Sequence, residues 1–261
     1  MFSFRNVLFL SLALALFSAC GGNTETEAAA ADTPVEQSDF QISLAQWSLH
    51  KSIFGELGND WSWFGRMLQE SPDSLLRGEI DPMDFPQIAA EEFDIHIIEL
   101  VNTFYYGKAN DQAYWEQFKA KCSEYDVQVG LIMCDALGNI GDADEAVRMQ
   151  TVENHYPWVD IAAYLGAHSI RVNAAGSGTA EEVAANAADG LSRLAEYAAS
   201  KGIKILVENH GGYSANGAWL AGVMAAVNKD NVGTLPDFGN FCIERGPDGC
   251  ADENDRYQGM E

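Results

Sequence analysis

Basic residues are scarce in this sequence. Lysine and arginine together number 15, against 39 aspartates and glutamates, which gives a formal net charge of −24. Such an acidic surface repels nucleic acid and anionic lipid, and it offers few groups that bind a phosphate. The composition therefore disfavours a nucleic-acid-binding protein, and it disfavours an enzyme that acts on phosphorylated substrates.

Two further signatures are lacking. No glycine-rich dinucleotide or phosphate-binding fingerprint follows a predicted strand, and no cysteines have zinc-finger spacing. The chain is instead 47% hydrophobic and 21% charged, which allows a sizeable core and excludes global disorder. Its 261 residues fit one large α/β domain or two small ones.

The beginning of the chain differs from the rest. Residues 1–19 contain Arg5 and an apolar stretch that is too short to span a bilayer as a stable helix, which predicts a signal peptide. Small residues precede Cys20, as in a bacterial lipobox, so we expect Cys20 to be lipidated; an ordinary cleaved signal peptide is the alternative. Residues 20–39 then form a flexible acidic tether. This organisation predicts an exported lipoprotein on the periplasmic side of a bacterial membrane, which it contacts only through its N-terminal lipid anchor.

Four further cysteines would meet an oxidising compartment if the protein is exported. Cys242 and Cys250 flank a short loop with glycine and proline, and they are candidates for a disulfide. Cys122 and Cys134 fall on a predicted helix and a predicted strand, where we expect each to be a small buried hydrophobe.

Residues 40–261 alternate between short apolar runs and helical segments. Predicted strands begin near residues 42, 95, 127, 168, 203 and 232, which indicates a parallel sheet with right-handed crossovers. A closed (β/α)8 barrel needs eight such units and about 250 residues. We therefore predict a TIM-barrel domain over 40–261 in which about six of eight units are present and the C-terminal part is missing; an open doubly wound sheet is the alternative.

Two consecutive predicted strands end in a carboxylate, Glu208 and Asp237. The carboxyl ends of barrel strands face the active site, so two acids there predict a shared divalent cation. Taken alone, each acid is better explained as a helix cap or a solvated loop residue, and it is the pair that favours a site. Oxygen ligands suit magnesium or manganese, and an added histidine admits cobalt or zinc.

Two other features bear on this site. Arg171 has the opposite parity to Ile170 and Val172 on the predicted strand 169–173, so we expect it to face the interior, where it needs an acidic partner. The aromatic-rich segment 51–76 follows the first predicted strand and is either a lid over the site or a satellite hydrophobic cluster.

Five segments resemble the sugar phosphate isomerase/epimerase family, the xylose isomerase-like TIM barrels. They are Ile42–His50, Ile98–Asn102, His168–Asn173, Val207–Gly212 and Leu235–Phe241. The resemblance spans nearly all of the chain after the tether. It implies one divalent metal held by a glutamate, an aspartate, a histidine and a second glutamate.

The first two of these ligands fall on Glu208 and Asp237, and the other two belong to strands that this sequence does not contain. The resemblance implies a sugar isomerase or epimerase in which Glu208 is also the general base, acting through an enediolate on an unphosphorylated sugar, keto-sugar or cyclitol. Asn240 stands where the family often has a substrate-contacting histidine. The candidate substrate-binding residues are Trp47, His50, Glu99, Asn102, Arg171, Asn209, His210 and Asn240.

Three other functions remain open on the same barrel. The first is a dehydratase of keto-polyols, which shares the initial proton abstraction. The second is a sugar-binding lipoprotein without turnover. The third is a metal-dependent endonuclease, against which the five histidines and the charge of −24 argue. The sequence predicts no oligomeric state.

Overall fold

The computed structural model describes residues 40–56, 60–246, 249–252 and 257–259. The predicted signal peptide, Cys20 and the tether lie outside these residues. The chain divides into a unit up to residue 40 and a compact unit from residue 41 to residue 261, and the description below concerns the second. Among the residues described, no helix has the length and apolarity needed to cross a membrane.

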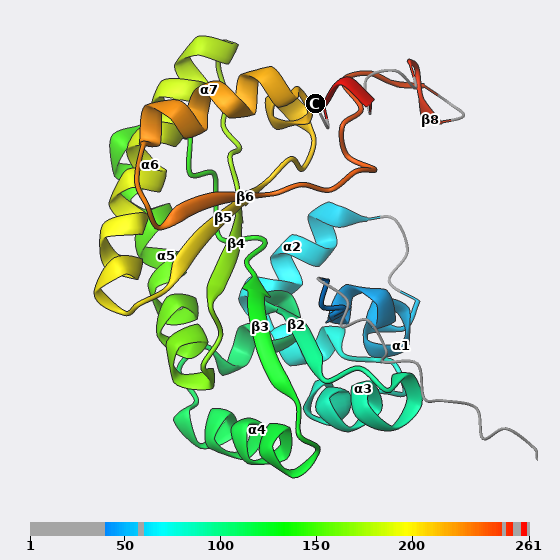
Figure 1. Cartoon of the computed structure of the whole chain (residues 1–261). Helices are drawn as coiled ribbons and strands as arrows, with labels where there is room; N and C mark the ends of the chain where they lie inside the picture. Colours follow the sequence, from blue (N-terminus) through cyan, green and yellow to red (C-terminus); the bar gives the residue numbers. More distant parts are fainter. Residues whose placement is uncertain (1–39, 57–59, 247–248, 253–256, 260–261) are drawn as a thin grey trace, which may run out of the picture. The chain divides into compact units, whose positions relative to one another are not determined.

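A parallel sheet forms the centre of this unit (Figure 1). Its strand order follows the chain, and every neighbouring pair is parallel. A doubly wound sheet reverses its order at a switch point, whereas a β/α barrel does not, so the predicted barrel topology is confirmed. The strands are β1 (Leu44–Ala45), β2 (Ile97–Val101), β3 (Gln128–Met133), β4 (Ser169–Asn173), β5 (Lys204–Glu208) and β6 (Val232–Leu235).

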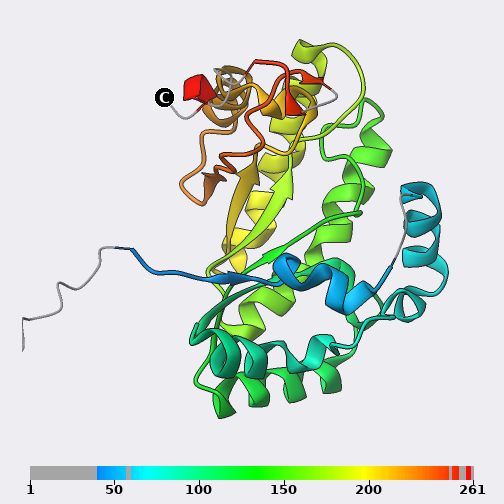
Figure 2. The same ribbon diagram turned by 90° about the vertical axis from the view of Figure 1, so that its right-hand side faces the viewer.

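Helices connect these strands. Figure 1 shows α5, α6 and α7 along one side of the sheet, and Figure 2 shows the segment from β1 through α2 separate from α6 and α7. A small antiparallel hairpin, β7 (Arg245–Gly246) with β8 (Gly249–Cys250), follows the sixth strand. The α-helices are α1 (His50–Phe54), α2 (Trp61–Glu70), α3 (Phe85–Phe93), α4 (Gln112–Glu124), α5 (Glu145–Leu165), α6 (Ala180–Ser200) and α7 (Gly217–Val227). The 3-10 helices are η1 (Gln46–Leu49), η2 (Pro72–Leu75), η3 (Pro82–Asp84), η4 (Asn102–Lys108) and η5 (Gly212–Ala215).

The ends of the two longest helices follow from the sequence. Thr179 and Glu182 form a capping box at the start of α6, in which each side chain accepts a hydrogen bond from the other's main-chain N–H. The side chain of Asp144 caps α5, which ends at Gly166 in the left-handed conformation (φ 83°). These caps place both helices in register with the strands that follow them.

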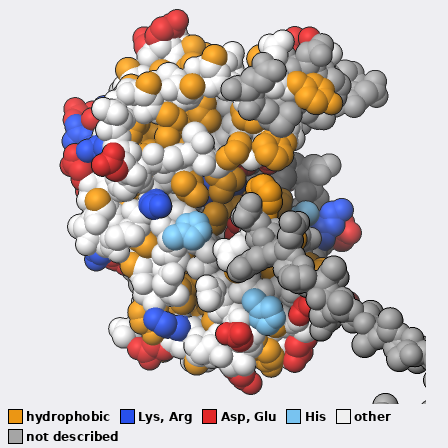
Figure 3. All heavy atoms as spheres, viewed as in Figure 1, with side chains coloured by type: hydrophobic (Ala, Val, Ile, Leu, Met, Phe, Trp, Pro, Cys, Tyr) orange, Lys and Arg blue, Asp and Glu red, His pale blue; other side chains and the backbone are white. Residues whose placement is uncertain are grey.

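Strand parity separates the core from the site. Ile170 and Val172 are fully buried in the hydrophobic core, and so are Ile205 and Val207 on the neighbouring strand. Residues of the opposite parity point to the other face of the sheet, and Arg171 is one of them. On the outer surface, Figure 3 shows apolar side chains near the middle of one face and acidic side chains towards its margins.

The first strand is shorter than predicted. The sequence indicates a strand over 42–46, whereas β1 contains only Leu44 and Ala45, and a 3-10 helix begins at Gln46. The reason is the buried side chain of Gln46. Its Oε1 accepts a hydrogen bond from the main-chain N of Val101, and its Nε2 donates to the hydroxyl of Tyr105. The side chain of Gln46 thus takes the place of the next main-chain hydrogen bond between β1 and β2.

The cysteine predictions are confirmed for the residues described. Cys242 and Cys250 form a disulfide that joins the loop after β6 to β8. Cys122 and Cys134 are free and buried. Burial raises the pKa of the Cys122 thiol to about 12 and that of Cys134 well above its usual range. Both thiols are therefore inert core groups rather than nucleophiles.

Candidate active site

A pocket of about 820 Å3 opens at the carboxyl ends of the strands. Residues from the first strand to the loop after the sixth contribute to its wall, which is where a β/α barrel places its active site. Its lining residues are Ala45, Trp47, Ser48, His50, Phe64, Gly65, Val101, Thr103, Met133, Asp135, Ala136, Arg171, Glu208, His210, Leu235, Asp237 and Asn240.

The two predicted acids meet in this pocket. Asn240 donates its side-chain amide to Glu208 Oε1 at 3.2 Å and to Asp237 Oδ2 at 2.9 Å. The main-chain N of Gly239 also donates to Asp237 Oδ1, at 2.7 Å. One nitrogen atom therefore contacts both carboxylates, so their oxygens converge on a common position. Asn240 reaches it because the turn after Asp237 closes with a hydrogen bond from Asn240 N to Asp237 O at 3.1 Å.

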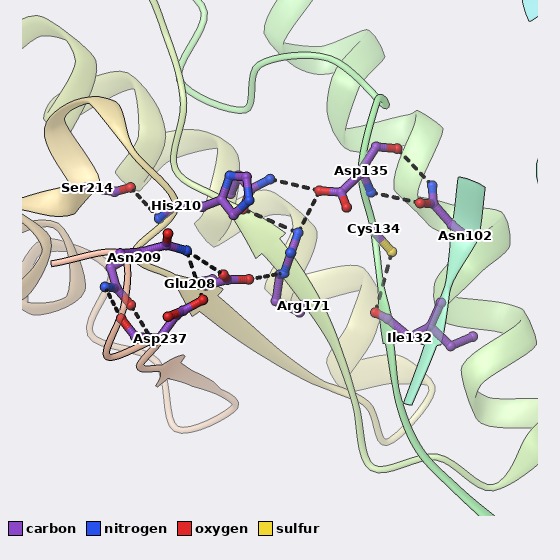
Figure 4. A network of polar contacts seen from close by, with 12 residues as sticks. Asn102, Ile132, Cys134, Asp135, Arg171, Glu208, Asn209, His210, Ser214 and Asp237 are labelled. Atoms are coloured by element: carbon purple, nitrogen blue, oxygen red, sulfur yellow. Dashed lines mark hydrogen bonds and ion pairs between the residues drawn. The ribbon is translucent and has the colours of Figure 1, made fainter. Parts of the chain in front are cut away.

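Arg171 lies beside these acids and is only 4% exposed. Its Nη1 donates to Asp135 Oδ1 at 2.6 Å, and its Nε forms a close ion pair with Glu208 Oε2 (Figure 4). The same Asp135 oxygen accepts from Asn173 Nδ2 at 3.1 Å. The prediction that Arg171 faces the interior and pairs with an acid of the site is confirmed.

Asp135 is a site residue that our sequence analysis missed. It lies two residues after the end of β3 and lines the pocket, with a side chain that is 29% exposed. Two signals pointed to it: it follows the strand next to that of Arg171, and a buried arginine between two strands with acids at their ends needs more than one acid.

Two fully buried asparagines, Asn102 and Asn209, bind the main chain of Asp135 and of Asp237. Asn209 accepts a hydrogen bond from Asp237 N at 2.7 Å and donates to Asp237 O at 2.8 Å. Asn102 makes the same two contacts with the main chain of Asp135, at 2.8 and 2.9 Å. The structure therefore places Asn102 and Asn209 behind the site. Glu99 does not line the pocket either, and it accepts a hydrogen bond from Ser43 at 2.6 Å.

The remaining predicted residues do reach the pocket. Trp47 and His50 stack with their ring centroids 4.7 Å apart and an interplanar angle of 8°, and His50 Nδ1 contacts Trp47 O. Phe64 of α2 contributes to the same wall and packs on Phe54. The segment 51–76 contributes Phe54 and Leu68 to the main hydrophobic core rather than to a satellite cluster. Its Phe64 and Gly65 line the pocket, and a role as a lid stays a prediction. An aromatic wall of this kind suits the apolar face of a sugar ring.

His210 enters the pocket from the loop after β5. Its main-chain N donates to Ser214 Oγ at 2.9 Å, and that hydroxyl donates to Gly211 O at 2.8 Å. Ser214 is buried, so this short loop has a fixed conformation. The position of the His210 ring therefore depends on a side chain at the start of η5.

Burial raises the pKa of Glu208 above its usual value, and the charges of Asp237 and Asp135 act in the same direction. The charges of Arg171 and His210 oppose this shift. A carboxylate with a raised pKa is a better proton acceptor at neutral pH than an ordinary surface glutamate.

The chemistry of these groups fits a divalent cation. Two carboxylates converge on the position of a hydrogen-bond donor, and hard oxygen ligands are what magnesium and manganese prefer. Within the part of the chain that the structure describes, no cluster of three or more histidine, cysteine, aspartate or glutamate side chains is arranged as a metal site. Glu208 and Asp237 are the two residues whose carboxylates could hold a cation here.

Several solved structures have a similar fold. The 3-keto-D-glucoside 4-epimerase from E. coli matches at 17% identity and a TM-score of 0.52, over 62% of this chain and 65% of that one. A probable 3-DHS dehydratase from Bacillus anthracis matches at 16% and 0.53, over 77% and 64%. A xylose isomerase-like TIM barrel protein from Mycobacterium smegmatis, in complex with magnesium, matches at 14% and 0.56, over 85% and 71%.

The chain spans less than two thirds of the length of the epimerase and of the dehydratase. At sequence identities this low, the similarity shows the fold alone. No curated protein matches the sequence. Residues 88–259 match a protein family described as the xylose isomerase-like TIM barrel. This stretch begins in α3 and includes every strand from β2 to β8, together with both acids of the pocket. The chain belongs to the xylose isomerase-like TIM barrel family.

Proposed function

We propose that this protein is a divalent-metal-dependent isomerase or epimerase of an unphosphorylated sugar, keto-sugar or cyclitol. The reaction is proton abstraction from the carbon beside a carbonyl group, through an enediolate. The observation that carries the proposal is the convergence of Glu208 and Asp237 on one side-chain nitrogen of Asn240, inside a pocket with an aromatic wall.

Glu208 and Asp237 would hold the cation, for which manganese, magnesium, cobalt and zinc are the candidates. Bound there, a divalent cation supplies Lewis acidity that stabilises negative charge on the substrate oxygens.

Glu208 is the group placed to accept the proton. It ends β5, lines the pocket and is 5% exposed, so bulk water competes little with a bound substrate. Burial raises its pKa, which favours proton transfer from carbon. Asn240 orients Glu208 through the hydrogen bond at Oε1, and Arg171 adds an ion pair at Oε2. A carboxylate held at both oxygens is preorganised for one direction of attack.

The charges of the pocket favour an unphosphorylated substrate. Among its described lining residues, Arg171 is the one lysine or arginine, and it already contacts Asp135 and Glu208. A phosphate group needs arginine, lysine or a run of free main-chain N–H groups. Three carboxylates around one neutralised arginine repel an anion instead.

We also propose that the protein is exported and anchored through a lipid on Cys20. The disulfide between Cys242 and Cys250 supports an oxidising compartment. Labelling with a radioactive fatty acid tests the anchor: incorporation that a Cys20→Ser variant abolishes supports it, and its absence from the wild-type protein contradicts it.

The test of the reaction is exchange of substrate protons with solvent. The full-length protein is incubated with Mn2+ and a panel of unphosphorylated ketoses and cyclitol ketones in D2O, and NMR follows deuterium at the carbon beside the carbonyl. We expect exchange and a new isomer or epimer with at least one sugar, and neither with the Glu208→Gln variant.

Other outcomes point to other functions. Exchange followed by loss of water assigns a keto-polyol dehydratase. Tight binding of a sugar without exchange assigns a binding protein and contradicts the proposed catalysis. Equal exchange rates in the wild type and in Glu208→Gln would show that Glu208 is not the base.

A further inference from the structure

The loop after β3 is built like the loop after β6. In both, a fully buried asparagine that follows the preceding strand binds the main-chain N and O of an aspartate: Asn102 binds Asp135, and Asn209 binds Asp237. The residue after Asp135, Ala136, has a φ of 58°, which is unfavourable for a residue with a Cβ. The main chain of Asp135 is therefore held by the same two hydrogen bonds as that of Asp237.

Arg171 contacts its two acids in different ways. The contact with Asp135 is a hydrogen bond of 2.6 Å from Nη1. The contact between Nε and Glu208 Oε2 is close but poorly aligned, and among the described atoms Nε has no hydrogen-bond partner. A charge-assisted hydrogen bond is strong when its N–H group points at the acceptor oxygen. Asp135 therefore fixes the guanidinium group, and Glu208 contributes mainly charge.

This difference matters when a cation enters. Asn240 contacts Glu208 at Oε1, whereas Arg171 contacts it at Oε2. A cation held at Oε1 would draw on the negative charge of Glu208 and so weaken the ion pair with Arg171. A buried arginine without an acidic partner is strongly unfavourable. Arg171 keeps such a partner because Asp135 lies outside the pair of converging acids and is fixed by Asn102.

We propose that Asp135 is a positioning residue that keeps Arg171 paired and so leaves Glu208 free to bind the divalent cation. Asp135 acts through Arg171 and does not touch the cation. The inference rests on the proposed cation site at Glu208 and Asp237, and it deepens that proposal by assigning a residue that sets the affinity of the site.

The test uses Mn2+ alone as the probe, with its binding to the full-length protein measured by electron paramagnetic resonance. In Asp135→Asn, the side chain keeps its shape and its main-chain bonds to Asn102, while Glu208 becomes the remaining acidic partner of Arg171. We expect Mn2+ to bind about tenfold to a hundredfold more weakly. The matched control is Asp189→Asn, which removes the acid of the Arg148 ion pair between α5 and α6 and should leave Mn2+ binding unchanged.

A double-mutant cycle separates positioning from simple charge. If Asp135 acts through Arg171, the effect of Asp135→Asn falls severalfold in an Arg171→Met background. An equal effect in both backgrounds would show that the charge of Asp135 acts directly, and this would overturn the inference. Thermal unfolding checks each variant, and Arg171→Gln replaces Arg171→Met if the latter does not fold.

The outcomes for the two proposals are distinct. Absence of Mn2+ binding to the wild type contradicts the cation site, and the inference falls with it. Wild-type binding that Asp135→Asn leaves unchanged contradicts the inference alone. A crystal structure with Mn2+ gives an independent readout: Arg171 should keep its hydrogen bond to Asp135, and a guanidinium group turned away from Asp135 would contradict the inference.

Discussion

The side chain of Asn209 pairs with the main chain of Asp237 as a neighbouring strand would, donating to its O at 2.8 Å and accepting from its N at 2.7 Å. The pair lies just beyond the last residues of β5 and β6, where main-chain pairing of the two strands has ended. The fully buried side-chain amide of Asn209 thus adds one more pair of hydrogen bonds between the ends of β5 and β6, and it holds Asp237 at the pocket.

Replacing Asn209 with alanine should both destabilise the protein and weaken cation binding. The substitution leaves the part-buried main-chain N–H of Asp237 without its partner and removes one of the two hydrogen bonds to Asp237 O, at a cost of about 2 kcal/mol in the free energy of unfolding. Chemical denaturation measures the first effect and Mn2+ binding the second. Asn154→Ala, which removes the hydrogen bonds of an exposed side chain with Leu137 O and Gln150 Nε2, is the control and should cost under about 1 kcal/mol. Similar losses for both variants would contradict the special role of Asn209.

Replacing Glu208 with glutamine should abolish turnover and preserve the fold. The loss of a general base lowers kcat by about 10² to 10⁴. Because Arg171 keeps its hydrogen bond to Asp135, replacing Glu208 by a neutral isostere should not lower the melting temperature by more than a few degrees. The control is Glu153→Gln, on the exposed face of α5, which should retain full activity. Activity comparable to that of the control would refute the assignment.

The raised pKa of Glu208 can be measured in the metal-free protein. Burial disfavours the charged carboxylate, so an NMR titration of this side chain should give a pKa above that of an ordinary glutamate. Bound Mn2+ should lower that pKa, because a cation favours the carboxylate form. A pKa at or below the ordinary value without metal would contradict the prediction.

His155 should make the protein sensitive to acid. Burial within α5 lowers the pKa of this histidine to about 4, while in the unfolded chain it is close to the ordinary 6.5. The unfolded state therefore binds an extra proton between these values, so stability is present above pH 6.5 and is lost as the pH falls. The loss attributable to this group is about 3 kcal/mol at pH 4.

Urea denaturation of the wild type and of His155→Gln, at several pH values between 7 and 4, measures this contribution as the difference in slope. The exposed His168 serves as the control, because His168→Asn should leave the pH dependence unchanged. Parallel pH profiles for the wild type and His155→Gln would contradict the prediction.

Opening the disulfide between Cys242 and Cys250 should lower stability by about 2 to 3 kcal/mol, the value that chain entropy gives for so short a loop. The double replacement by serine avoids a reactive free thiol, and its melting temperature without reductant is compared with that of the wild type. The wild type in reductant should match the variant. A variant as stable as the oxidised wild type would show that the hairpin of β7 and β8 is constrained by its packing instead.

Strand positions and strand parity could be predicted because they depend on local pattern. The alternation Ile170–Arg171–Val172 placed the arginine inside, and Lys201 with Gly202 marked the end of α6 before the next strand. The end of β1 could not be predicted, since it depends on a contact between Gln46 and Val101, 55 residues further along. A side chain that replaces main-chain pairing in this way leaves no periodic pattern in the sequence.

The candidate site also has features that the sequence predicts and features that it does not. The acids at the strand tips were found from their positions, whereas the roles of the two asparagines were not. A polar residue at a strand tip can face either a ligand or its neighbour's main chain, and the sequence does not distinguish them. Asp135 was missed because its importance depends on β3 lying next to β4, which is a property of the assembled sheet.

Asn102 and Asn209 touch only main-chain atoms of the residues they fix. Main-chain atoms are the same in every amino acid, so each contact defines a location and is indifferent to the side chain that occupies it. The location of the main chain is therefore kept when the side chain changes: a new acid, amide or hydroxyl placed there would start from the same point at the edge of the pocket. A barrel built in this way can acquire new chemistry by single substitutions while its architecture stays constant.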